Sequence, residues 1–379
     1  MRKIIGSFLL FAAAAALCGC SGQPAAQQSD NVTIVKLMKP ENIPDFYDVL
    51  SGFSEEHPDI RVKFTDAPCK TLERHGLYVS AMEGRDSSVD IYWLNDEWID
   101  EFAKYEYIKP FDDDFEIAHD GYIIDTKSRF EYDGRLYALP IGLDTDVLFY
   151  RNDIISQPPK RWTQLEAGNV GVNSYTGEDA IYNIINIQRA EACEYAQALE
   201  LYKKLITDTD TNETDFAAAF KTGRKAMFLG PASDFRELNS SSSAIRGSFS
   251  VTLVPPGEPD KHFIRAYGLG INANSENTEE AKEVLNYLKT VDAGRLLARS
   301  CSVMPVIGSL YNDEMVLYDN AHFGALKTIA ENSPSYSSAG IGGAKTVRLN
   351  DALKMYLAGS LTADEAGEIF NEEINNGQQ

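Results

Sequence analysis

The chain has 379 residues. This is too long for a domain with a single ordinary hydrophobic core, so the length predicts two lobes or domains. Its composition, 44% hydrophobic and 24% charged, is that of a globular protein. Acidic side chains number 57 against 35 basic ones, which gives a net charge of −22. This excess leaves no basic surface for a phosphate backbone and argues against electrostatic docking on anionic lipid, so nucleic acid is excluded as a partner.

The start of the chain predicts an export signal. A charged start, 1–3, precedes an apolar run, 4–17, that is too short to span a bilayer as a folded helix. The run ends in Leu-Cys-Gly-Cys at 17–20, which resembles the bacterial lipobox and implies cleavage before Cys20 and acylation of that cysteine. The alternative is an ordinary cleavage site with an incidental cysteine.

Cleavage after residue 19 removes Arg2 and Lys3, so the net charge of the mature chain changes from −22 to −24. The polar segment 20–31 then predicts a flexible, lipid-anchored tether. We expect an exported protein that is anchored by lipid to the outer face of the cell membrane or lies in the periplasm. Three widely spaced cysteines remain in the body, so any disulfide leaves one thiol over.

Strand-like and helix-like segments alternate along the body. The predicted strands are 33–37, 60–64, 89–94, 136–140, 147–150, 170–173, 225–229, 249–254 and 267–272. The predicted helices are 43–56, 72–83, 193–206, 214–222 and 278–288, one that starts near 174–178 with a Ser or Thr cap, and a helical region from 349 with Gly359 as a stop and Thr362 as a cap. This alternation predicts an α/β fold whose mostly parallel sheet is covered on both faces.

Two polar interruptions in apolar runs suggest where a ligand binds. The strand at 89–94 stops at the polar group 95–98, and such sheets bind ligands at the carboxyl ends of their strands. The joint 141–146 interrupts a second apolar run, as a boundary between two lobes would.

Five segments in order resemble the family 1 extracellular solute-binding proteins of ABC importers, which include maltose- and trehalose-binding proteins. They are 89–112 with its Val-Asp-Ile-Tyr-Trp-Leu-Asn-Asp-Glu-Trp start, 134–153 with Gly-Arg-Leu-Tyr-Ala-Leu-Pro, 225–231 with Ala-Met-Phe-Leu-Gly-Pro, 267–281, and 352–370. The resemblance implies a two-lobed, type II periplasmic-binding-protein fold with crossover hinge segments. It places lobe 1 at 32–143 plus 268–305 and lobe 2 at 144–267 plus 306–379, after the signal at 1–19 and the tether at 20–31.

The chain also departs from that family pattern. Ala232 stands where many members have an aromatic residue after Gly-Pro, and 339–343 is an unusual glycine-rich stretch. These departures leave the identity of the sugar open.

A sugar offers vicinal hydroxyls around a ring with apolar faces, so planar polar side chains and aromatic rings suit it. The expected ligand-binding residues are Asn95, Asp96, Trp98, Asp144, Tyr175, Glu178, Gly230, Pro231, Tyr267 and Tyr336. Eight of them have a structural alternative: Trp98 in a lobe core, Asp144 as acceptor for a hinge N–H, Tyr175 and Glu178 at a helix start, Gly230-Pro231 as a plain turn, and Tyr267 and Tyr336 as packing or surface residues.

No motif for a metal, a cofactor or a catalytic nucleophile accompanies this pattern. The segment from Asp208 starts like an EF-hand, but Glu213 stands where glycine is required and Ala219 where the bidentate glutamate belongs. The five histidines have no metal-ligand spacing, and GxSxG and P-loop sequences are absent. We therefore expect no cofactor and no enzyme activity.

The sequence predicts a monomeric receptor that binds a mono- or oligosaccharide between two lobes, closes on it and docks on the membrane permease of an ABC importer. One alternative keeps the fold but binds a polyamine or another cation, because Asp96, Glu97, Asp144 and Asp146 are cleft candidates. A second is an exported glycosidase with two catalytic carboxylates.

Overall fold

The computed structural model describes residues 32–112, 115–117, 121–123, 126–165, 169–172, 175–207, 215–255, 263–333 and 343–375. All of them belong to one compact unit of the chain. The predicted signal and tether lie outside the described residues, and so do Cys20 and Tyr336. Within the described part, no helix combines the length and the apolar character that crossing a bilayer requires.

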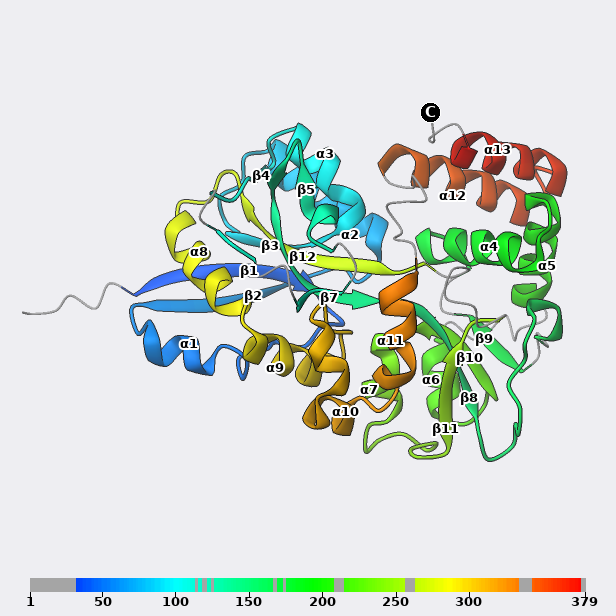
Figure 1. Cartoon of the computed structure of the whole chain (residues 1–379). Helices are drawn as coiled ribbons and strands as arrows, with labels where there is room; N and C mark the ends of the chain where they lie inside the picture. Colours follow the sequence, from blue (N-terminus) through cyan, green and yellow to red (C-terminus); the bar gives the residue numbers. More distant parts are fainter. Residues whose placement is uncertain are drawn as a thin grey trace, which may run out of the picture. The chain divides into compact units, whose positions relative to one another are not determined.

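The larger of the two main sheets combines strands from residues 33–144 with one later strand, β12 (Figure 1). Its strands are β1 (Thr33–Pro40), β2 (Ile60–Ala67), β3 (Ile91–Asn95), β4 (Ile108–Lys109), β7 (Ala138–Asp144) and β12 (Arg265–Asn272). The order is β2-β1-β3-β12-β4, with β7 also paired to β12. Because β12 is antiparallel to β3, β4 and β7, those three run the same way, as the alternation of strands and helices predicts.

The smaller main sheet has the order β11-β8-β10-β9. Its strands are β8 (Asp146–Arg151), β9 (Val170–Val172), β10 (Met227–Pro231) and β11 (Phe249–Leu253). A separate hairpin pairs β5 (Glu131–Tyr132) with β6 (Arg135–Leu136). Strands β7 and β8 are consecutive but belong to different sheets, so the chain crosses between the sheets at Thr145.

Helices pack around both sheets. They are α1 (Ser51–Glu56), α2 (Thr71–Glu83), α3 (Ile99–Lys104), α4 (Glu178–Glu191), α5 (Tyr195–Thr207), α6 (Phe216–Lys221), α7 (Phe235–Leu238), α8 (Thr278–Leu288), α9 (Val291–Cys301), α10 (Glu314–Asp319), α11 (Phe323–Asn332), α12 (Gly343–Leu357) and α13 (Ala363–Asn375). Helices α4, α5, α12 and α13 lie together beside the small sheet (Figure 1).

Two hydrophobic clusters form the cores. One contains the large sheet, whose β3 is buried at every position, and it extends into the small sheet through Phe149 and Phe228. The other joins the opposite side of the small sheet to α4, α5, α12 and α13, where Tyr195 packs on Phe370. Each core buries the apolar faces that the strand and helix patterns predict.

The predicted helix at 43–56 is wrong in its first part, since only Ser51–Glu56 is helical. Ile43, Phe46 and Val49 are nevertheless buried, and the N–H of Val49 bonds to the carbonyl of Phe46 in a turn. Successive turns repeat every three residues, so they bury the same positions that an amphipathic helix would bury. Burial was therefore predicted correctly where backbone conformation was not.

Two predictions about helix caps have opposite outcomes. Helix α4 begins after Gly177, at φ +90°, instead of after a Ser or Thr cap. The C-terminal prediction is confirmed: Thr362 Oγ1 accepts from the N–H of Glu365 at 3.2 Å, and Glu365 Oε2 accepts from the N–H of Thr362 at 2.8 Å. This reciprocal pair is a capping box that fixes the start of α13.

Candidate functional site

A cavity of about 290 Å³ lies where the ends of β7 and β10 meet the large sheet and α2. This volume is close to the lower end of the range, roughly 300–1,000 Å³, that is usual for small-molecule sites. The walls come from elements of both sheets. They include the crossing from β7 to β8 and the start of β12, where the chain has returned from the small sheet to the large one. Residues that line it and carry polar or aromatic groups are Lys70, Arg74, Trp93, Asp144, Asp179, Ser233, Asp234, Arg265 and Tyr267.

Asp144, the last residue of β7, holds the loop after β10 against the crossing. Its Oδ2 accepts from Ser233 Oγ at 2.7 Å, and its Oδ1 accepts from the N–H of Thr145 at 2.9 Å. Burial raises the pKa of Asp144, while the Arg265 guanidinium opposes that shift. Asp144 therefore combines the two roles that the sequence left open, cavity lining and acceptor for a backbone N–H at the hinge.

Arg265, the first residue of β12, ties the large sheet to groups of the other side. Its Nη2 lies 3.1 Å from Asp146 Oδ1 on β8, and its Nη1 lies 2.8 Å from Asp179 Oδ1 on α4. Burial raises the pKa of Asp146 to about 7 although Arg265 opposes the shift. One guanidinium on the large sheet thus forms ion pairs with a carboxylate on the small sheet and with another on α4.

Asp234 ends the short 3₁₀ turn Ala232–Asp234 that follows β10, and it lines the cavity. Within the described part of the chain, its carboxylate has no hydrogen-bond donor and no ion-pair partner. Burial, and then repulsion by Asp144, Asp146 and Asp179, raises its pKa to about 8. Asp144 has the hydroxyl donor of Ser233, and Asp146 and Asp179 pair with Arg265. The ionised form of Asp234 has no such donor or cation in the described structure to stabilise it.

The opposite wall presents buried donors. Arg74 on α2 is 3% exposed, and its Nη2 donates to Asn95 Oδ1 at 3.0 Å. Its Nε is buried and has no acceptor in the described structure, and the same is true of Trp93 Nε1. A buried N–H without an acceptor is costly, so both groups favour a bound molecule that supplies oxygen acceptors.

Behind the cavity, carboxyl groups from the two sides meet. Glu97, just beyond β3, accepts from Asn95 Nδ2 at 2.7 Å, and its carboxyl interacts with that of Glu178, the first residue of α4. The Oε2 atoms of both side chains are buried and have no hydrogen-bond partner in the described structure. Two carboxyl groups can hydrogen-bond to each other only when one of them carries a proton. Burial, and then the charge of Glu178, raises the pKa of Glu97 to about 8.

The structure brings three of the predicted ligand residues, Asp144, Pro231 and Tyr267, into the cavity lining. Gly230 immediately precedes Pro231 in β10 and pairs with Val147 of β8. A Cβ atom on Gly230 would lie 2.5 Å from the ring of Phe228. Its missing side chain thus serves packing within the small sheet.

The predicted group at the end of β3 lies behind the lining. Asn95 orients Arg74, and Asp96 accepts from the N–H of Ala266 at 3.2 Å. Trp98 does not reach the cavity: it is 2% exposed and packs edge-on to Tyr78, in the lobe-core position that was its structural alternative. The polar group therefore supports the site from behind.

The remaining predicted residues divide in the same way. Glu178 is buried and meets Glu97, whereas Tyr175 packs its ring edge-on against Phe216 at 5.2 Å. Tyr336 lies outside the described residues.

Sequence reasoning missed the cavity residues Arg74, Trp93, Asp179, Asp234 and Arg265. A signal existed for two of them, because Arg74 stands inside an amphipathic helix pattern and Arg265 starts an apolar strand pattern. A charged residue on a core-facing position needs a partner, and such positions often mark sites.

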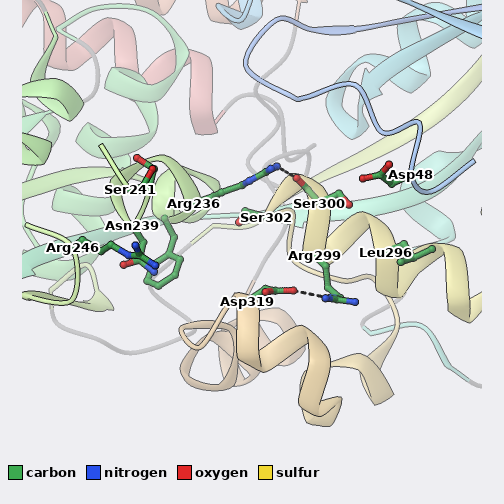
Figure 2. Close-up of a pocket in the computed structure, with 12 residues that line it drawn as sticks. Asp48, Arg236, Asn239, Ser241, Arg246, Leu296, Arg299, Ser300, Ser302 and Asp319 are labelled. Atoms are coloured by element: carbon green, nitrogen blue, oxygen red, sulfur yellow. Dashed lines mark hydrogen bonds and ion pairs between the residues drawn. The ribbon is translucent and has the colours of Figure 1, made fainter. Parts of the chain in front are cut away.

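A second, larger hollow of about 540 Å³ lies between α7 and α9 (Figure 2). Three arginines surround it. Arg299 pairs with Asp319 at 2.6 Å, and Arg236 donates to the carbonyl of Ser300, while Arg246 lies on the far side. Two of the three guanidiniums therefore have partners within the protein.

Comparison with known proteins agrees with this architecture. The family model for bacterial extracellular solute-binding proteins matches residues 33–295. A probable ABC transporter-binding protein of Deinococcus radiodurans is 23% identical over 351 residues, which cover 80% of this chain and 83% of the relative. A maltotriose-binding protein of Pyrococcus abyssi is 24% identical over 343 residues, covering 80% and 72%.

Solved structures match over most of the chain. Maltose-bound T. maritima MalE3 superposes with a TM-score of 0.78 at 19% identity, over 91% of this chain and 99% of that one. A solute-binding protein of Agrobacterium vitis with bound D-mannitol gives 0.73 at 15% identity, over 91% and 97%.

The fold is therefore that of the two-lobed, type II periplasmic binding proteins. The chain belongs to the family of bacterial extracellular solute-binding proteins, as its sequence pattern predicted.

Proposed function

We propose that this protein is the receptor of an ABC importer for a carbohydrate, a mono- or oligosaccharide that binds in the cavity between the two sheets. The observation that carries this proposal is the pairing of opposite walls. Buried donors of Arg74 and Trp93 face a side that is rich in carboxylate acceptors, including Asp144 and Asp234. A sugar hydroxyl both donates and accepts, so a polyol ring suits both walls at once.

The same walls weigh against a polyamine. Ammonium groups donate three hydrogen bonds and accept none, so a polyamine would satisfy Asp234 but leave Arg74 Nε and Trp93 Nε1 without acceptors. The maltose-bound and mannitol-bound relatives also favour a carbohydrate or polyol. A cationic solute without hydroxyl groups remains the competing ligand that the experiment must test.

Transport by this receptor rests on hinge closure. We propose that lobe 1 comprises 32–143 plus 268–305 and lobe 2 comprises 144–267 plus 306–379, joined where β7 passes into β8 and where β12 begins. A ligand that contacts both sides binds the closed arrangement more tightly, so it shifts the population toward closure. The closed, monomeric receptor then docks on the transmembrane subunits of the importer.

The lipobox-like segment supports a second proposal, that the mature chain begins at an acylated Cys20 and stays at the outer face of the membrane. Two or more acyl chains suffice for stable anchoring. Mass spectrometry of the protein expressed in a bacterial host tests this: we expect loss of 1–19 with added acyl mass, and Cys20→Ala should release an unacylated protein.

A thermal-shift screen tests the ligand class. Maltose, cellobiose, glucose, mannitol, putrescine and spermidine are each added to the purified body, residues 32–379. We expect a saccharide to raise the melting temperature, since a ligand at 100 times its Kd adds about 2.7 kcal/mol of stability. Stabilisation by the polyamines alone would contradict the proposal.

The enzyme alternative has its own test. Chromogenic glycosides incubated with the same protein should yield no product above a buffer control, because a receptor releases its ligand unchanged. Product formation that is lost in Glu97→Gln or Asp144→Asn would overturn the receptor assignment.

A further inference from the structure

If the protein is the carbohydrate receptor proposed above, the lining of its cavity also favours one chemical class of carbohydrate. Asp234 lines the cavity, and its carboxylate has no donor and no cation as a partner in the described part of the chain. This side chain is only partly exposed, and a carboxylate in such a position is disfavoured unless it binds a proton or a partner. The cavity thus contains one acidic group that the protein itself leaves uncompensated.

The other carboxylates on this side of the cavity already have hydrogen-bond donors or an ion-pair partner within the protein. Asp144 accepts from the hydroxyl and the N–H of Ser233, and Asp146 and Asp179 share the guanidinium of Arg265. Because Arg265 is engaged with those two carboxylates, it does not neutralise Asp234. The carboxyl group that lacks a partner therefore belongs to the turn after β10, in the same loop where Ala232 stands in place of an aromatic side chain.

The facing wall requires something different from the ligand. Arg74 is 3% exposed and Trp93 is 1% exposed, yet Arg74 Nε and Trp93 Nε1 have no acceptor in the described structure. Both side chains line the cavity. A ligand that fits therefore presents oxygen acceptors at one end and a cationic donor at the other.

We propose that the protein binds an amino sugar, a saccharide with a protonated primary amine, and that Asp234 receives the ammonium group. The hydroxyls of the same molecule accept from Arg74 and Trp93. A charge-assisted hydrogen bond is stronger than the bond of a neutral hydroxyl, so the amine decides the preference between otherwise similar sugars.

Calorimetric titration with matched sugars tests the proposal. The pairs are glucosamine against glucose and the β1,4-linked glucosamine disaccharide against cellobiose, which differ only by amine for hydroxyl. We expect wild-type protein to bind the amino sugar on the order of tenfold more tightly in at least one pair. In Asp234→Asn that preference should fall to about twofold or less while the neutral sugar still binds.

Glu237→Gln is the matched control, because Glu237 lies three residues further along the chain, outside the cavity, where it pairs with Lys221. This variant loses the same charge and should keep the preference. Asp234→Ala serves as a second variant if the asparagine protein melts at a lower temperature than wild type.

The outcomes separate the two proposals. Equal binding of both members of each pair by wild type, or an unchanged preference in both Asp234 variants, overturns the amino-sugar inference and leaves the carbohydrate receptor standing. If no saccharide of either kind binds and spermidine does, the carbohydrate receptor itself is wrong.

Discussion

Glu97 links protonation to stability at a single residue. Burial, and then Glu178, raises its pKa to about 8, whereas an ordinary glutamate has a value of 4.5. Between these two pH values the folded state holds a proton that the unfolded state has lost, so the free energy of unfolding falls as pH rises. Glu97→Gln carries no such proton. We expect it to unfold with a free energy higher than wild type by on the order of 2–4 kcal/mol at pH 8.

At pH 4 both proteins should be equally stable, because wild-type Glu97 is then protonated in the folded and the unfolded state. Urea unfolding followed at pH 4, 6 and 8 measures the difference. Glu56→Gln on α1, which removes an exposed carboxylate, is the control and should follow wild type. A gain from Glu97→Gln that is the same at every pH would contradict the proton linkage.

The sequence predicts which polar residues lie at strand ends, but it does not predict which side chains or backbone groups they contact. Asp144 was found because it interrupts an apolar run at a crossing, and Tyr267 because it belongs to a recognisable strand. Asp234 is the last residue of a short turn, and the local sequence does not show which way that turn points its side chains. Trp98 shows the converse, since the local pattern that suggested a ligand contact also suits a buried core position.

Gly142 in β7 packs directly against Val303, in the segment that follows α9. A Cβ at this position would lie 2.1 Å from Val303 Cγ1, so Gly142→Ala forces the segment around 303 away from β7. We expect a loss of about 1–3 kcal/mol in chemical denaturation. Val303→Ala removes the clashing methyl group, so the double variant should recover most of that loss relative to Val303→Ala alone.

Gly134 in the β5–β6 turn is the contrasting position, because no atom lies near its missing Cβ and only its φ of +74° opposes a side chain. Gly134→Ala should lose about 1 kcal/mol or less, and Val303→Ala should not restore it. Recovery of Gly134→Ala by Val303→Ala would mean that the rescue at Gly142 is not a local steric effect.

Elements were predictable where periodicity and burial agree. Helix α8 follows its predicted bounds, Thr278–Leu288, because an amphipathic pattern and acidic residues in the first turn coincide. The stretch before α1 was mispredicted since turns bury the same positions. Helices α9, α10 and α11 were not predicted at all, although signals for two of them exist. Thr290 and Asp313 cap α9 and α10 through side-chain oxygens, and Pro305 and Gly308 separate these two helices.

The pair Glu97 and Glu178 connects the two sides of the cavity. Glu97 follows β3 of the large sheet, and Glu178 begins α4, which lies beside the small sheet. Below the raised pKa of Glu97 the pair carries at most one negative charge, and loss of the proton on Glu97 sets two negative charges against each other. Arg74 and Arg265 attract these carboxyls and Asp179 repels them, so only the part that depends on Glu97 belongs to the pair. We expect small-angle X-ray scattering of the ligand-free protein to show a larger radius of gyration at pH 9 than at pH 6. Glu97→Gln, whose amide donates to Glu178 at either pH, should give the same radius at both. A pH-dependent radius that persists unchanged in this variant would assign the opening to other carboxyls, Asp146 first among them.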